Sequence, residues 1–346
     1  MFDDGGWNSS YIRGFDYKHT NTETYYFTFY SEFGERGVAV VAEAVVLSVT
    51  LVASIVTNLA FIVPLVKGRH RTVTNHFLLN LGFADILFAI GIPAVVVVRI
   101  NQKWPLGDLI CRLLPYSQLV CGFMVLWSLT FVSIERYRCL TLDPQLRITS
   151  NTAKLLIAIL WIFALALFSP ITFWFRHEES LNICTLRFPK AGIKISLFFT
   201  IITTLFTCII PICILVFNYH RIFMKMVENR QRWELPTVLN SSLSRQEEAR
   251  VRKHIRIMRV ALFNMLVVLA MWLPITVVLC LIYVDGDRPL SDNSFFLRSH
   301  HFIYSLTLAL VNTAVNPFLS GVIRFTCSAD QSQGISKLLR LASSFN

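Results

Sequence analysis

The chain has 346 residues, of which 54% are hydrophobic and 15% charged, and its formal net charge at pH 7 is +11. Soluble globular domains carry about 45–50% apolar and about 25% charged residues, so this composition excludes an ordinary water-soluble globule. It indicates instead a protein that places most of its apolar chain in a membrane.

Seven stretches of 21 to 27 residues hold almost no charge: 44–66, 72–98, 113–134, 155–175, 195–220, 260–284 and 299–323. Each is long enough to cross the membrane, because a helix that rises ~1.5 Å per residue spans the hydrocarbon layer in about 20 residues. We therefore predict an all-α integral membrane protein, a seven-transmembrane helix bundle. The predicted parts are an N-terminal tail (1–37), the membrane domain (38–323) and a C-terminal tail (324–346) with room for a short amphipathic helix.

The basic residues are distributed unequally between the two sides of these spans. One set of loops carries 20 of the 32 Lys and Arg residues, and the other carries 12. By the positive-inside rule the richer side is cytoplasmic, so we expect an extracellular N-terminus. The positive charge then faces anionic membrane lipid, which accounts for the basic balance without nucleic-acid binding.

Two of the eight cysteines, Cys111 and Cys184, lie near the extracellular face. They are the only pair on the oxidising side, so we predict a disulfide between them. Asn8, in the sequence Asn-Ser-Ser of the same side, is a candidate glycosylation site. No metal-ligand spacing, cofactor motif or nucleophile with a local base is visible, so we expect no cofactor and no enzyme.

Asp85 lies in the middle of the second stretch, where a charge costs at least ~2.5 kcal/mol on insertion scales. It therefore calls for partners inside the bundle, and the candidates are Asn58 of the first stretch and Asn312 and Asn316 of the seventh. Pro317 follows Asn316, and Pro274 lies in the sixth stretch; proline frees a backbone carbonyl and kinks a helix. These positions are candidate points of movement.

Glu135-Arg136-Tyr137 ends the third span on the cytoplasmic side, and Trp272 precedes Pro274 by two residues. These motifs follow one another in a fixed order. In this order the chain resembles the rhodopsin-like (class A) G-protein-coupled receptors over residues 38–325. The resemblance implies a plasma-membrane receptor that binds an extracellular ligand and activates heterotrimeric G proteins. It also implies an activation switch formed by Asp85, Glu135, Arg136, Tyr137, Tyr219, Trp272, Asn312, Asn316 and Pro317.

In this resemblance Arg136 faces the G protein, Glu135 holds it in the inactive state and Trp272 forms the floor of the ligand pocket. Three positions depart from the family pattern. Ser320 and Val268 stand in place of a tyrosine and a phenylalanine, and His254 in place of an acid, so the level of basal activity is left open.

The ligand class is narrowed by exclusion. Leu310 stands where opsins carry their lysine, and Gln118 where amine receptors carry an aspartate. The pocket that the resemblance implies is apolar and aromatic. Its predicted lining is Gln118, Leu119, Gly122, Phe123, Phe198, Phe199, Trp272, Thr276, Leu279, Phe302 and Leu306.

Arg99 and Glu43 lie at similar heights near the extracellular ends of the second and first spans, about 21–22 Å outward of Asp85 and Asn58. A guanidinium binds a carboxylate well, and its partner is either an acidic ligand or Glu43. The chain is most similar to the omega-3-sensing branch of the long-chain free fatty acid receptors. That similarity implies a fatty acid or related lipid as ligand, with Arg99 in the binding site.

Two alternatives stay open. An aromatic N-terminal tail and a basic second outer loop, with Arg187, Lys190 and Lys194, also suit a neuropeptide receptor. A transporter or channel is the remote alternative, because inverted repeats and paired broken helices are not visible.

Overall fold

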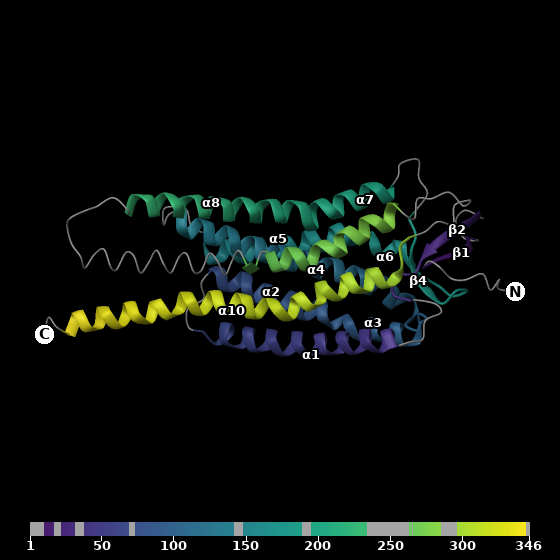
Figure 1. Ribbon diagram of the computed structural model, residues 1–346, viewed down its shortest axis with the longest axis horizontal. Helices are drawn as coiled ribbons and strands as arrows, with labels where there is room; N and C mark the ends of the chain where they lie inside the picture. Colours follow the sequence, from purple (N-terminus) through teal and green to yellow (C-terminus); the bar gives the residue numbers. More distant parts are fainter. Residues whose placement is uncertain are drawn as a thin grey trace.

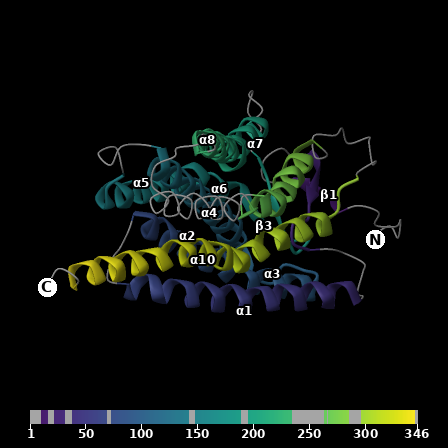
Figure 2. The ribbon, with the colours of Figure 1, turned by 60° about the vertical axis from the view of Figure 1, so that its left-hand side comes forward.

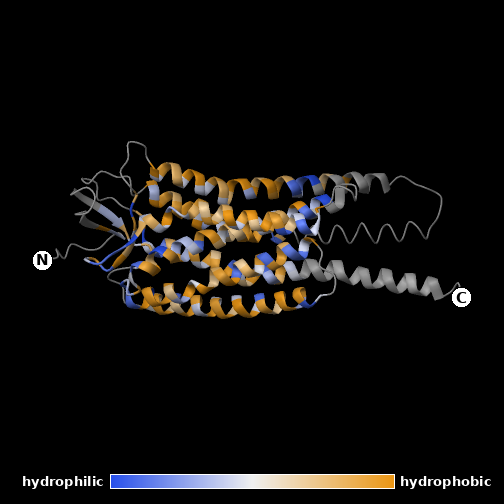
Figure 3. Cartoon of the chain, turned by 180° about the vertical axis from the view of Figure 1, so that it is seen from behind, coloured by the Kyte–Doolittle hydropathy of each residue, from blue (hydrophilic) through white to orange (hydrophobic). Residues whose placement is uncertain are grey.

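The computed structural model describes residues 10–16, 22–31, 38–68, 73–141, 148–188, 195–233, 263–264, 266–284 and 296–343. Within these residues seven helices are long and apolar enough to cross a membrane: Ala39–Lys67, Val73–Asn101, Gly107–Glu135, Ser150–Trp174, Ile195–Arg221, Leu266–Val284 and Ser299–Gly321. They run along the long axis of the molecule (Figure 1). Hydrophobic residues dominate their middle parts, and hydrophilic residues gather toward the ends (Figure 3). The predicted seven-helix membrane bundle is confirmed.

Several spans consist of more than one helical element. The elements are α1 (Val38–Lys67), α2 (Val73–Ile90), α3 (Ile92–Asn101), α4 (Gly107–Thr141), α5 (Ser150–Phe168), α6 (Ile171–Trp174), α7 (Ile195–Thr204), a π-helical turn (Leu205–Ile209), α8 (Ile210–Trp233) and α10 (Ser299–Ser343). α10 continues past the seventh span through most of the predicted C-terminal tail (Figure 1).

The second span is interrupted at Gly91, between α2 and α3. Pro93 at the start of α3 has no N–H to donate to the preceding turn. α3 then packs against α1, so the interruption determines which residues of α1 the outer end of the second span meets.

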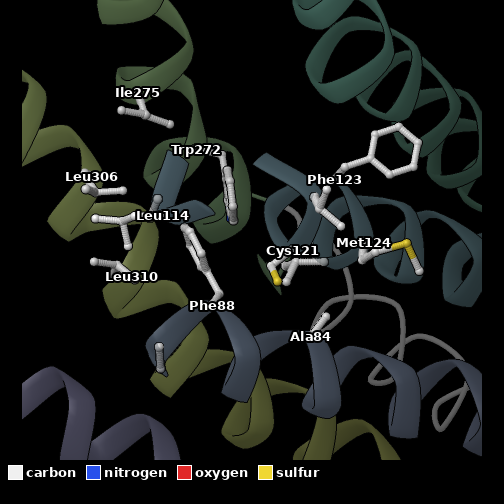
Figure 4. Packing of buried hydrophobic residues seen from close by; sticks show 14 of the residues in the cluster. Ala84, Phe88, Leu114, Cys121, Phe123, Met124, Trp272, Ile275, Leu306 and Leu310 are labelled. Atoms are coloured by element: carbon white, nitrogen blue, oxygen red, sulfur yellow. The ribbon is translucent and has the colours of Figure 1, made fainter. Parts of the chain in front are cut away.

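The centre of the bundle is α4, which packs against α2, α5, α6 and α8. Figure 4 shows side chains of this helix, among them Cys121 and Met124, in one apolar cluster with Phe88 of α2 and Trp272 of the sixth span. Buried apolar residues of α2, α4, α5, α6 and the sixth span belong to one cluster, which continues to the N-terminal hairpin.

Two short β-hairpins lie at the end of the bundle that we predict to be extracellular (Figure 1). The first pairs β1 (Tyr11–Asp16) with β2 (Thr22–Phe27), and the second pairs β3 (Phe175–Glu178) with β4 (Ile183–Leu186), both antiparallel. The Thr185 hydroxyl of β4 donates to the carbonyl oxygen of Phe27 at 3.0 Å, so the two hairpins are joined. Figure 2 shows β1 and β3 at the same end of the bundle in a turned view. The first hairpin lies within residues 1–37, for which we predicted only a tail.

The predicted disulfide joins Cys111 of α4 to Cys184 of β4. It fixes the second hairpin to the outer end of α4, where the backbone N–H of His177 also donates to Asp108 Oδ1 at 3.0 Å. Asn8, the candidate glycosylation site, lies outside the described residues.

We expect Cys111→Ser to reduce the free energy of unfolding by about 2–4 kcal/mol, because the bond closes a long segment of chain. The measurement is the Tm of the purified full chain in detergent. Cys213→Ala, which removes a free exposed cysteine, is the control and should leave the Tm unchanged. Equal Tm values for both variants would contradict a stabilising role for the bond.

Candidate functional site

A cavity of about 290 Å³ lies between α4, α7, the sixth span and α10, at the low end of the size of small-molecule pockets. Its wall is mostly aromatic and aliphatic. Ten of the positions assigned to the pocket from the sequence lie in this wall: Gln118, Leu119, Gly122, Phe123, Phe199, Trp272, Thr276, Leu279, Phe302 and Leu306.

Two assigned positions, Phe198 and Arg99, do not contribute to the wall. Phe198 is 64% exposed and lies on the outer side of α7. Neighbouring residues of a helix differ in direction by about 100°, so with Phe199 in the cavity wall Phe198 faces the membrane. Arg99 is buried and is held by another partner, described below.

The floor of the cavity is Trp272. Its indole stacks on Phe88 with ring centroids 5.6 Å apart, and Figure 4 shows the two rings beside each other. The indole Nε1 donates to Asn312 Oδ1 at 3.0 Å. A Cβ on Gly122 would lie 2.8 Å from two carbons of the indole ring. Glycine at this position therefore allows the ring to lie flat against α4.

The fifth span contributes threonine side chains to the wall through an irregular turn. Thr203, Thr204 and Thr207 lie in the wall, next to or within the π-helical turn that precedes Pro211. The Trp127 indole donates to the carbonyl oxygen of Phe206 at 3.0 Å and so satisfies a backbone acceptor of the turn. Such turns are frequent at functional sites.

The N-terminal segment covers the cavity, and we call its lining residues Tyr11, Tyr25, Phe27, Phe29 and Tyr30 the roof. Phe29 and Tyr30 are buried against Phe302, with ring centroids 5.3 and 5.6 Å apart. The Tyr30 hydroxyl donates to Gln118 Oε1 at 3.0 Å. Burial raises the pKa of Tyr30, so its hydroxyl stays protonated and remains a donor. The backbone N–H of Ser299 donates to the Ser10 hydroxyl at 2.7 Å, which anchors the roof to α10.

Arg99 forms a buried ion pair with Glu43. Its Nη2 and Nε lie 2.7 and 2.8 Å from Glu43 Oε2, and both side chains are at least nine-tenths buried. Nη1 donates to the carbonyl oxygen of Tyr30 at 3.4 Å and to the Ser299 hydroxyl at 3.5 Å. The sequence left an acidic ligand and Glu43 as possible partners of Arg99, and in the structure the partner is Glu43. The pair joins α1, α3, α10 and the roof.

Asp85 is fully buried and accepts from Asn316 Nδ2, at 3.2 Å for one carboxylate oxygen and 3.3 Å for the other. Asn58 Nδ2 donates to the carbonyl oxygen of Thr313 at 2.9 Å, which ties α1 to the same turn of α10. Asn312, another candidate partner of Asp85, instead accepts from the Trp272 indole and donates from Nδ2 to Met271 Sδ at 3.5 Å.

At the cytoplasmic end, Glu135 of α4 and Tyr219 of α8 are buried, and Tyr137 is half-buried. Arg136 lies in α4, but its side chain is outside the described part of the structure. The expected contact between Glu135 and Arg136 therefore stays a prediction. Pro317 lies inside α10, directly after Asn316.

The sequence profile of the family described as "7 transmembrane receptor (rhodopsin family)" matches residues 57–319. The chain belongs to this family. The receptor is accordingly a multi-pass membrane protein rather than an enzyme, and its family implies coupling to G proteins. The family-level expectation from the sequence is confirmed.

The receptors to which this chain is similar have names that refer to different classes of ligand. It is 28% identical to free fatty acid receptor 4 of Rattus norvegicus over 87% of its own chain and 84% of the relative. It is 27% identical to somatostatin receptor type 5 of Bos taurus (82% and 73%) and 27% identical to neuropeptide receptor 22 of Caenorhabditis elegans (72% and 59%). At these identities the ligand class does not follow from the relatives.

The roof residues Tyr11, Phe27, Phe29 and Tyr30 were not among the residues predicted to line the pocket. From the sequence, Phe27, Phe29 and Tyr30 belonged only to the aromatic tail that suits a peptide ligand. A signal was present, because 22–27 (TETYYF) is rich in threonine and aromatic residues, which favour strands. The pairing of this segment with 11–16 and its contacts with distant helices had no local signal.

We expect Gly122→Ala to lower the free energy of unfolding of the receptor by about 1–3 kcal/mol, because the new methyl group overlaps the Trp272 ring. In a Trp272→Phe background the same change should cost much less. The measurement is a double-mutant cycle of Tm values in detergent. Gly321→Ala, where a Cβ would meet nothing within 4 Å, is the control. Additive effects of Gly122→Ala and Trp272→Phe would contradict the contact.

We expect Glu43→Leu and Arg99→Met each to destabilise the receptor by about 3–5 kcal/mol, because each leaves an uncompensated buried charge. The double variant should recover most of the loss, since it removes both charges together. Surface expression and Tm of all four forms give the coupling. Two single losses that simply add in the double variant would show that the ion pair is not what holds these helices together.

Proposed function

We propose that this receptor binds a small lipid, a fatty acid or a related acyl compound, and activates heterotrimeric G proteins in response. The observation that carries the proposal is the cavity: it is apolar and aromatic, and the N-terminal roof covers it on the extracellular side. An acyl chain gains free energy in such a site by leaving water, at about 25 cal/mol per Å² of apolar surface. The relative named free fatty acid receptor 4 supports the same ligand class.

The proposed signal begins at Trp272, which the ligand contacts at the floor. Movement of the indole acts on Asn312 through their hydrogen bond, and so on the turn of α10 that also carries Asn316 and Pro317. Asp85 accepts from Asn316 and links this turn to α2. The change then reaches Glu135-Arg136-Tyr137, where Arg136 engages the G protein.

A peptide ligand is the second candidate. It is favoured by the relatives named somatostatin receptor type 5 and neuropeptide receptor 22. A peptide would have to displace the roof or bind above it, because Tyr30 and Phe29 are packed against Phe302. The contacts of the roof therefore favour the lipid.

The test is nucleotide exchange on G proteins in membranes that carry the full receptor, with a panel of acyl lipids and a panel of neuropeptides. We expect responses to acyl lipids and none to peptides. Arg136→Ala, matched for surface expression, should abolish the response because the arginine is the proposed contact with the G protein. A response confined to the peptide panel would overturn the lipid proposal, and an undiminished response in Arg136→Ala would overturn the proposed role of the arginine.

A further inference from the structure

The part of the cavity wall that the structure describes contains no Lys, Arg, His, Asp or Glu. Two cations near the extracellular end are engaged elsewhere. Arg99 is paired with Glu43 at 2.7 Å. Arg187 is paired with Glu178 at 2.9 Å, and its guanidinium lies 4.4 Å from the centre of the Tyr26 ring. Neither arginine contributes to the wall.

Two polar atoms of the described wall are buried without a hydrogen-bond partner: Gln118 Nε2 and Thr203 Oγ1. Two other hydroxyls of the wall already donate to backbone carbonyl oxygens. The Thr276 hydroxyl donates to the carbonyl oxygen of Trp272 at 3.1 Å, and the Thr207 hydroxyl donates to that of Thr203 at 2.6 Å. Among the described wall residues, Gln118 and Thr203 are therefore the two whose buried polar atoms still lack a hydrogen bond that a ligand could supply.

The Gln118 amide keeps this capacity whichever way it is turned. As placed, Oε1 accepts from Tyr30 and Nε2 has no partner. With oxygen and nitrogen exchanged, Nε2 would meet the Tyr30 oxygen, and Oε1 would be the atom left over. A ligand hydroxyl satisfies either arrangement, because it both donates and accepts.

The charge of the head group decides between lipid classes. A carboxylate in this wall would lose its water without meeting a cation, which is strongly unfavourable. An uncharged head group with hydroxyl or ether oxygens loses less hydration and can satisfy the two buried polar atoms, each of which is costly when left unpaired. The uncharged wall therefore selects against the acid form of the same acyl chain.

We propose that the receptor's ligand is an acyl or alkyl lipid with an uncharged, hydroxyl-bearing head group, anchored by Gln118 and Thr203. This rests on the proposed lipid function and specifies its ligand class. The aromatic wall takes the hydrocarbon chain. Gln118 has two separate roles: one end of its amide holds the roof through Tyr30, and the other holds the head group.

The test compares two probes with one chain length, lauric acid and 1-O-dodecylglycerol, in nucleotide exchange with membranes carrying the full receptor. The ether link prevents esterases from converting the neutral probe to an acid. We expect the glycerol ether to be at least about tenfold more potent than the acid, the scale expected for one unfavourable buried group. Membranes without the receptor control for effects of the probes on the bilayer.

Variants separate the two roles of Gln118. Gln118→Met and Thr203→Val should each weaken the glycerol ether about 3- to 10-fold, the range of one neutral hydrogen bond, and should leave the small response to the acid unchanged. Tyr30→Phe is the matched control: it removes the hydrogen bond between Gln118 and the roof and leaves the anchor in place. We expect Tyr30→Phe to weaken the glycerol ether less than Gln118→Met does. If Gln118→Met fails to reach the membrane, Gln118→Asn, which keeps the amide on a shorter side chain, tests whether Gln118 anchors the head group.

Each outcome supports or overturns the inference. If lauric acid is the more potent probe, the neutral ligand class is wrong and the lipid function stands. Loss of that acid response in Lys190→Gln or Lys194→Gln would then identify a cation outside the described residues. Equal losses in Gln118→Met and Tyr30→Phe would show that Gln118 acts through the roof and not on the ligand. A response to the peptide panel alone would overturn the lipid function and the inference with it.

Discussion

The buried ion pair between Glu43 and Arg99 is the interaction on which the extracellular half of the receptor depends. Two charges removed from water are tolerated only when they meet each other at short range with further hydrogen bonds. Here the guanidinium meets one carboxylate oxygen at 2.7 and 2.8 Å, and it also reaches Tyr30 and Ser299. One side chain thus joins α1, α3, α10 and the roof. Because Glu43 neutralises the arginine, the same contact keeps positive charge away from the cavity.

The remaining polar groups of the membrane bundle follow the same constraint. Hydrocarbon offers no hydrogen bonds, so a polar side chain inside the bundle needs a partner from a neighbouring helix. Asn80 of α2 illustrates this: its Nδ2 donates to the Ser128 hydroxyl of α4, and its Oδ1 accepts from the Trp161 indole of α5, each at 2.8 Å. Asn218 of α8 likewise donates to the Ser133 hydroxyl at 3.0 Å. Each of these bonds fixes the register of one helix against another.

Much of this arrangement was predictable from the sequence because hydropathy and helix rise are local properties. They give the seven spans, and the shared depth of Glu43 and Arg99 made Glu43 one of two candidate partners of the arginine. The order of motifs gave the family. Two residues predicted to line the cavity do not line it, for different reasons. The side of the helix that Phe198 faces depends on the rotation of α7. The partner of Arg99 depends on a competition between Glu43 and the carboxylate of a ligand. Neither is encoded in the spacing of residues.

The roof depends on contacts that only the folded chain provides. β1 and β2 pair with each other, but Thr185, Ser299 and Gln118 lie far along the sequence and hold them over the cavity. The sequence pattern of the N-terminal segment does not predict these partners. The preference of threonine, tyrosine and phenylalanine for strands is compatible with a hairpin and says nothing of where the hairpin docks.

The roof and the proposed switch are connected through one wall of α4. Gln118 meets Tyr30 at the top of this wall, and Gly122, one turn further along the helix, meets Trp272 at the bottom. Side chains at i and i+4 lie on the same face, so a ligand that binds between them contacts the roof and the floor together. Since Trp272 bonds to Asn312 of α10, a shift of the indole reaches α10 without passing through the lipid-facing surface. In the proposed function, the short distance along α4 between the two residues lets a ligand in the cavity act on the bundle directly.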